Sequence, residues 1–201
     1  MDPRLIGALE LRDVDGVCAF CEDEDDRPRV LAMYNGAVMH AYNAMQDLEL
    51  VVSLGERAFA YARACGDDVI VLAKPIAYNV GSFTWSGWDD GPAIEHRHLA
   101  AGHAAAELNL EVAQRLDRGI GNARWLVGAH QLAAGRRSDA AASFRAAVDA
   151  AEDRASELLF GGYVAIAEGE PMRDLLRDEL SGLEDGRFYL DQLDTAARVF
   201  A

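Results

Sequence analysis

GNARWLVGAHQLAAGRRSDAAASFRAAVDAAEDR, residues 121–154, is the stretch that decides the fold. Residues 135–138 (GRRS) break it into two segments, and each segment has the periodicity of an amphipathic helix. Apolar residues recur at helical spacing on both sides of this break, at Trp125, Val127, Leu132, Ala140, Phe144, Ala147 and Val148. The stretch therefore predicts two helices joined by a tight turn.

Two glycines of this stretch have counterparts 34 residues later in the sequence. Gly162 follows Gly128, and Gly169 follows Gly135, at this spacing. A fixed period of this length indicates a repeated helix pair. In the later copy, the first helix is SELLFGGYVAIAEG, and we expect the second to begin near Pro171, which suits a first helical turn.

Two earlier units are expected upstream, around Gly36 and Gly81. Gly81 lies 47 residues before Gly128, and we assign the excess over one period to an inserted loop at 86–98 (SGWDDGPAIEHRH). The segment GERAFAYARACGD is the expected second helix of the first unit.

These units are expected to form one domain over 1–201. Residues 1–28 form an N-terminal helical cap, broken near Asp13, residues 29–183 hold the repeats, and 184–201 form a C-terminal capping helix. Abundant alanine favours closely packed helices over sheet.

The repeat unit resembles the tetratricopeptide family, whose 34-residue helix pairs carry small or aromatic residues at fixed positions. Five of those positions fall here on Gly128, Gly135, Ala140, Phe144 and Ala147. The resemblance implies an all-α, right-handed solenoid of three to four antiparallel helix pairs. It also implies a concave groove lined by the first helix of each pair.

Carried over onto this chain, the groove-facing positions include Tyr78, Trp85, Asn122, Trp125 and Tyr163. Aromatic anchors in a concave surface are typical of binding sites, so these five are the expected partner-binding residues. No lysine or arginine falls on the groove positions, which favours a basic or apolar partner. The alternative is that the rings are buried beneath the inserted loop, a terminal helix or a second copy of the chain.

The formal net charge is −15, from 34 acidic and 19 basic residues, and Lys74 is the only lysine. Nucleic acids and anionic membranes both require basic patches, so neither is an expected partner. Three cysteines without a signal peptide, and without a long apolar segment, predict a cytoplasmic protein.

The leading hypothesis is a non-catalytic scaffold that binds a protein or peptide in an aromatic groove with acidic walls. No catalytic residue and no cofactor are expected. A metal-binding protein or enzyme centred on the loop, with His96 and His98, is the second hypothesis. Cys18 and Cys21 are a weaker candidate metal or redox pair. Self-association through the concave face, as in a homodimer, is the third.

Overall fold

The computed structural model describes residues 1–89, 91–172 and 174–201, so residue 90 of the expected 86–98 loop lies outside the described residues. Within these ranges the regular structure is entirely helical, which confirms the all-α class. None of the helices in this part of the chain is long and apolar enough to cross a membrane.

The described chain groups into two compact units. Unit 1 comprises Met1–Thr84 and Pro92–Val112, and unit 2 comprises Trp85–Gly91 and Ala113–Ala201. Helix α7 (His96–Leu116) begins in unit 1 and ends in unit 2, so the two units share a continuous helix. The expected 86–98 loop is therefore divided between the units.

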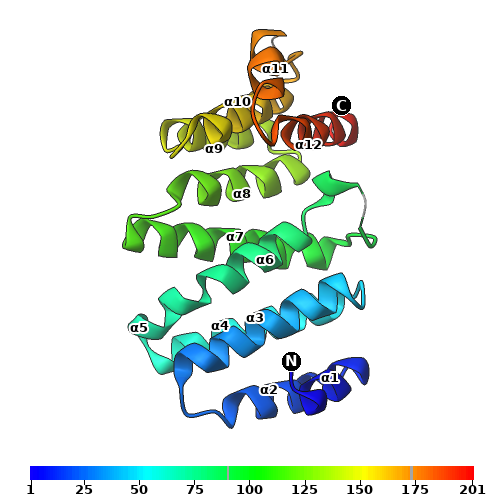
Figure 1. Cartoon of the computed structure of the whole chain (residues 1–201), viewed down its shortest axis with the longest axis vertical. Coiled ribbons are helices and arrows are strands. Elements are labelled where there is room, and N and C mark those ends of the chain that lie inside the picture. The colour runs from blue at the N-terminus through cyan, green and yellow to red at the C-terminus, as the bar shows by residue number, and fades with distance from the viewer. Residues whose placement is uncertain (90, 173) are drawn as a thin grey trace. The chain divides into compact units, whose positions relative to one another are not determined.

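Unit 1 contains the N-terminal helices and the start of α7 (Figure 1). Its other helices are α1 (Pro3–Glu10), α2 (Val14–Glu22), α3 (Arg27–Asn43), α4 (Leu48–Cys65), α5 (Asp67–Ile70), η1 (Val71–Ala73) and α6 (Lys74–Phe83). Aspartate side chains cap three of them: Asp2 accepts a hydrogen bond from the Arg4 amide, Asp13 accepts one from the Gly16 amide, and Asp47 accepts one from the Leu50 amide. Such N-caps satisfy amides that a helix start leaves without partners, so the expected break near Asp13 is confirmed.

Unit 2 contains the 121–154 stretch and its 34-residue counterpart. Its helices are η2 (Ser86–Trp88), the end of α7, α8 (Ile120–Ala133), α9 (Arg137–Asp149), α10 (Arg154–Glu168), α11 (Asp174–Ser181) and α12 (Gly186–Val199). Consecutive helices α8, α9 and α10 pack side by side and are joined by short turns (Figure 1).

The two glycines at the helix ends make the same turn. Gly135 and Gly169 adopt φ of 73° and 72°, the left-handed region that favours glycine. After α8, the Gly135 and Arg136 amides donate to carbonyls of the last helical turn. The Gly169 and Glu170 amides do so after α10. Both are Schellman motifs, so the 34-residue spacing marks two structurally equivalent helix ends.

Gly128 marks a close helix crossing. A Cβ added at Gly128 would lie 2.7 Å from the Phe144 ring, which belongs to α9 and is fully buried. Only glycine leaves room for a large side chain at this separation. The α8–α9 pair therefore depends on both residues.

The next helix pair departs from the sequence expectation. A Cβ added at Gly162 of α10 would lie 2.6 Å from Leu193, which belongs to α12 and not to the preceding α11. Ala196 is buried three residues after Leu193, as Ala147 is three residues after Phe144. Helix α12 thus takes the place on α10 that α9 takes on α8, and α11 is an insertion between the two partners.

We expect Gly128→Ala to lower the free energy of unfolding by about 1–3 kcal/mol, because the new methyl group overpacks the buried Phe144 ring. The matched control is Gly7→Ala in α1, where no described atom lies within 4 Å of an added Cβ. That change should leave stability equal or raise it by about 0.5–1 kcal/mol. Denaturant midpoints measure both, and a Gly128→Ala chain as stable as the parent would contradict the crossing.

Candidate functional site

Three of the five expected binding residues come together in unit 2. The ring centroids of Trp85 and Trp125 are 5.6 Å apart, those of Trp85 and Tyr163 are 5.9 Å apart, and those of Trp125 and Tyr163 are 5.5 Å apart. Each pair meets edge to face, the arrangement that aromatic quadrupoles favour. The rings form one cluster, drawn from the segment after α6 and from helices α8 and α10.

The clustered rings are buried, which corrects the expectation of an open aromatic groove. Trp85 and Tyr163 have no exposed surface, and Trp125 keeps 4%. Trp88 of η2 meets Trp85 edge-on at 4.9 Å, and Phe200, after α12, stacks on Trp85 at 5.9 Å. These neighbours exclude water from large apolar surfaces, which is the favoured state for such rings.

The other two expected residues keep exposed side chains. Asn122 is exposed in the first turn of α8, in unit 2. Tyr78 is 37% exposed on α6, in unit 1. Of the five, these two are the ones that offer side-chain surface to a partner.

Tyr78 is exposed on α6, which packs against α3, and we call the exposed surface of these two helices the α3/α6 face. The two helices pack against each other, and the Asn79 side-chain amide donates to the Asn35 side-chain oxygen at 2.9 Å. Met39, one helical turn after Asn35, is 41% exposed. Asn35 and Met39 are not among the residues expected from the sequence, although their spacing of four residues places them on one side of a helix.

The two helices of the α3/α6 face carry no negative side chain, a feature that α8 shares. Neither α3 (RPRVLAMYNGAVMHAYN) nor α6 (KPIAYNVGSF) contains an acidic residue, in a chain that has 34. The basic side chains of Arg27, Arg29 and Lys74 lie at the two helix starts. The acidic walls expected for the binding surface are therefore not supplied by these helices.

Partial burial also affects the phenol of Tyr78. Desolvation raises its pKa above the usual value, because the charged phenolate is the form that burial disfavours. The hydroxyl thus stays protonated at neutral pH and is a hydrogen-bond donor. The face combines a donor, two side-chain amides and apolar surface.

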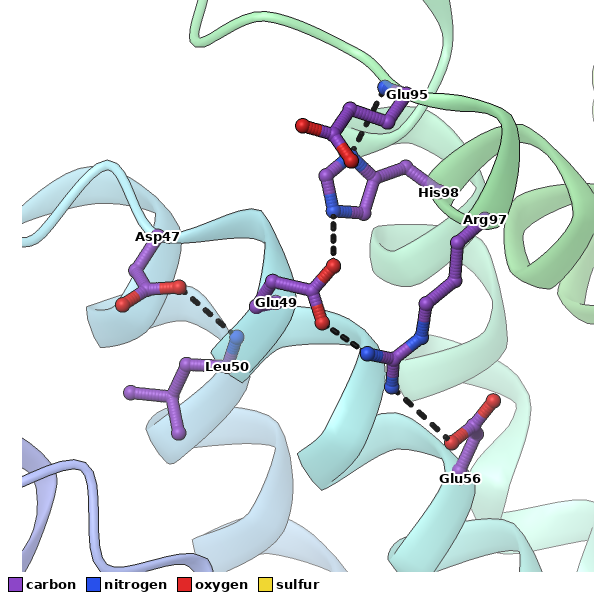
Figure 2. Close-up of polar contacts among 7 residues, drawn as sticks. All are labelled: Asp47, Glu49, Leu50, Glu56, Glu95, Arg97 and His98. Carbon is purple, nitrogen blue, oxygen red and sulfur yellow. Dashed lines mark hydrogen bonds and ion pairs between the residues drawn. The ribbon is translucent and has the colours of Figure 1, made fainter.

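A polar network joins the start of α7 to α4 within unit 1 (Figure 2). The Glu95 backbone amide donates to Nδ1 of His98 at 3.0 Å, and Nε2 of His98 contacts Oε1 of Glu49 at 2.9 Å. Because Nδ1 accepts, the proton is on Nε2, which donates to the carboxylate. Arg97 pairs with the other oxygen of Glu49 and lies 3.9 Å from Glu56.

His98 serves as a helix cap in this geometry. It occupies the third helical position of α7 and reaches back to the N-cap amide of Glu95, as a glutamate does in a capping box. Both ring nitrogens are engaged, so His98 has no free lone pair for a metal or for general base catalysis. His96, its proposed partner in metal binding, is exposed. Among the residues placed by the structure, no group of three or more His, Cys, Asp or Glu side chains is arranged to hold a metal.

The Cys18-x-x-Cys21 pair lies in the core of unit 1. Cys18 is 2% exposed and Cys21 is fully buried, and both are free thiols. Burial raises the pKa of Cys21 to about 12, with smaller contributions from Cys18 and Glu22. Since the thiolate is the reactive and metal-binding form, Cys21 behaves as a small apolar core residue, and Cys18 is buried beside it.

We expect His98→Ala to lower the free energy of unfolding by about 1–2 kcal/mol, because it removes the side chain that caps the first turn of α7. The control is His96→Ala in the same helical turn, which should change stability by less than about 0.5 kcal/mol because the side chain is exposed. Thermal or denaturant unfolding gives both values. Equal effects of the two substitutions would contradict the capping role of His98.

We expect the folded protein to present one thiol to a water-soluble disulfide reagent at pH 8, and the denatured protein to present three. Cys65 is partly exposed, whereas Cys18 and Cys21 are buried. Cys65→Ser should abolish the fast reaction of the folded chain. Rapid modification of Cys18 or Cys21 in the native state would show that the pair is reactive.

The chain was also compared with protein-family models, curated proteins and solved structures. None of these three comparisons found a significant match.

Proposed function

We propose that this protein is a non-catalytic helical-repeat scaffold that binds another protein or a peptide through the α3/α6 face. The observation that carries the proposal is that Tyr78 and Met39 are exposed on the two helices that the Asn35–Asn79 amide pair joins, and that neither helix has a carboxylate. A surface that mixes apolar side chains with amide donors and acceptors suits a polypeptide partner.

The amide pair supplies the polar part of this recognition. Each side-chain amide has two donor hydrogens and an oxygen that accepts two bonds. The Asn79–Asn35 bond uses one donor of Asn79 and one lone pair of Asn35, and Nδ2 of Asn35 donates weakly to the Met39 sulfur at 3.8 Å. The remaining groups are able to pair with the main chain of an extended segment. Tyr78 and Met39 then contact its side chains, so an uncharged, apolar segment fits better than a basic one.

The tetratricopeptide resemblance supports the same proposal. The equivalent turns at Gly135 and Gly169, together with the Gly128–Phe144 crossing, agree with a 34-residue helix pair. We infer a tetratricopeptide-like solenoid of three to four such pairs. Asn122, in unit 2, stays a predicted contact residue of that unit and is not part of the α3/α6 face. We also place the protein in the cytoplasm, because all three cysteines are free thiols.

The test begins with a partner isolated from the native cell and then purified. We expect Tyr78→Ala to weaken its affinity by roughly tenfold or more, because truncation of an aromatic anchor at an interface commonly has this effect. Leu11→Ala is the control: the side chain is 81% exposed, in the same unit but on another segment.

The expected result is a loss of affinity for Tyr78→Ala and an unchanged affinity for Leu11→Ala, with both chains folded by circular dichroism. An unchanged affinity for both Tyr78→Ala and Asn79→Ala would overturn the assignment of the α3/α6 face.

A further inference from the structure

Helix α12 covers a surface of unit 2 that we call the α12 seat, formed by Gly162, Trp85 and Asp89. Leu193 lies on Gly162, Phe200 stacks on Trp85, and Arg198 pairs with Asp89 at 3.2 Å. The seat therefore offers residues 193–200 three features: the space above a glycine, the face of an aromatic ring and a carboxylate.

The apolar contact that holds α12 is small. Apart from Gly186, α12 has two buried residues, Leu193 and Ala196. Helix α9, which takes the equivalent place on α8, has four (Ala140, Ala141, Phe144 and Ala147). Because apolar burial dominates helix docking, α12 is bound less strongly to α10 than α9 is to α8.

The polar contacts of α12 lie at the surface. The Arg198–Asp89 pair has side chains 65% and 53% exposed, and the Arg177–Asp194 pair has side chains 44% and 49% exposed. Exposed ion pairs contribute little to stability. Helix α12 is thus a candidate for local opening that leaves the rest of unit 2 folded.

The closed form also retains an unfavourable feature. Trp125 is 4% exposed, and its Nε1 has no hydrogen-bond partner among the described residues. By contrast, Nε1 of Trp85 donates to the Ala129 carbonyl at 2.9 Å. A buried donor without a partner raises the free energy of the packed aromatic cluster on which Phe200 stacks.

We propose that the α12 seat is a second binding site, which takes an amphipathic helix from a partner protein in place of α12. The segment now bound defines the partner: a leucine-sized residue, a small residue three positions later, an arginine at five and an aromatic ring at seven, as in Leu193, Ala196, Arg198 and Phe200. The chain's own α12 is then the competitor in cis.

This site is independent of the α3/α6 face, because all its residues belong to unit 2. Its affinity for a partner is governed by competition. A tethered α12 acts at a high effective concentration, so a free helix binds weakly until α12 is weakened or outcompeted.

The experiment uses the full chain and a fluorescent synthetic peptide of residues 184–201. Phe200→Ala removes the stacked ring from the cis helix, while the peptide supplies that ring in trans. We expect the Phe200→Ala chain to bind the peptide at least roughly tenfold more tightly than the parent chain does. Phe188→Ala is the matched control, because its ring lies on the same helix and is 61% exposed.

The control chain should bind the peptide as the parent does, and a peptide that itself carries Phe200→Ala should bind the variant chain more weakly. Equal peptide affinities for the parent and the folded Phe200→Ala chain would overturn the proposal. If light scattering shows that the parent chain is a dimer and that the peptide dissociates it, the seat binds a second copy of the chain and the proposal of a different partner is overturned.

Hydrogen exchange on the unmodified chain provides a second measurement. The amides of α12 should exchange through a local opening, faster than those of α8 and α10. Protection of α12 equal to that of α8 and α10 would show that the helix opens only with global unfolding, and this would also overturn the proposal.

Discussion

Close contact between a glycine on one helix and a large side chain on the next is the interaction on which the packing depends. Gly128 faces Phe144, and Gly162 faces Leu193. Unit 1 contains a contact of the same kind, since a Cβ added at Gly55 of α4 would lie 2.6 Å from Val80 of α6. A missing side chain brings two backbones close, and the facing residue fills the space and excludes water. The helix that supplies the facing residue therefore sets the local topology.

This constraint explains the C-terminal part of unit 2. Gly162 needs a large apolar side chain above it, and Leu193 of α12 supplies one, whereas α11 contributes only Leu180 to the interior. With α12 on α10, the chain end brings Phe200 onto Trp85. The burial of the aromatic cluster thus follows from the choice of helix partner, and the same choice gives α12 its small contact area.

Periodicity was sufficient to predict the helices of the 121–154 stretch, because every position there agrees in apolar pattern, turn chemistry and small-residue placement. The partner of α10 was not predictable in this way. Residues 174–181 and 186–199 are both amphipathic, and a 34-residue period favours the nearer one. In the structure, the segment that packs on α10 is the one whose leucine contacts Gly162. This depends on tertiary packing and not on sequence spacing.

The candidate site was predicted in part, for related reasons. The expected groove positions include Trp85, Trp125 and Tyr163, whose rings pack together, but sequence spacing does not reveal what covers a group of rings. His98 was considered as a metal ligand because of its neighbour His96, whereas its ring caps α7. A histidine at the third position of a helix has the reach for both roles, and only the positions of Glu95 and Glu49 distinguish them.

The distribution of charge gives a physical reason why α3 and α6 suit a partner. Association removes water from both surfaces, and desolvation of a carboxylate without a partner is strongly unfavourable. On a chain with a net charge of −15, a partner that binds to most helical surfaces would have to desolvate carboxylates. The α3/α6 face has no carboxylate to desolvate on either helix, and its amides retain hydrogen-bonding capacity for a main chain. An apolar segment therefore loses less hydration free energy there than on an acidic helix of the same chain, and this difference directs it to the α3/α6 face.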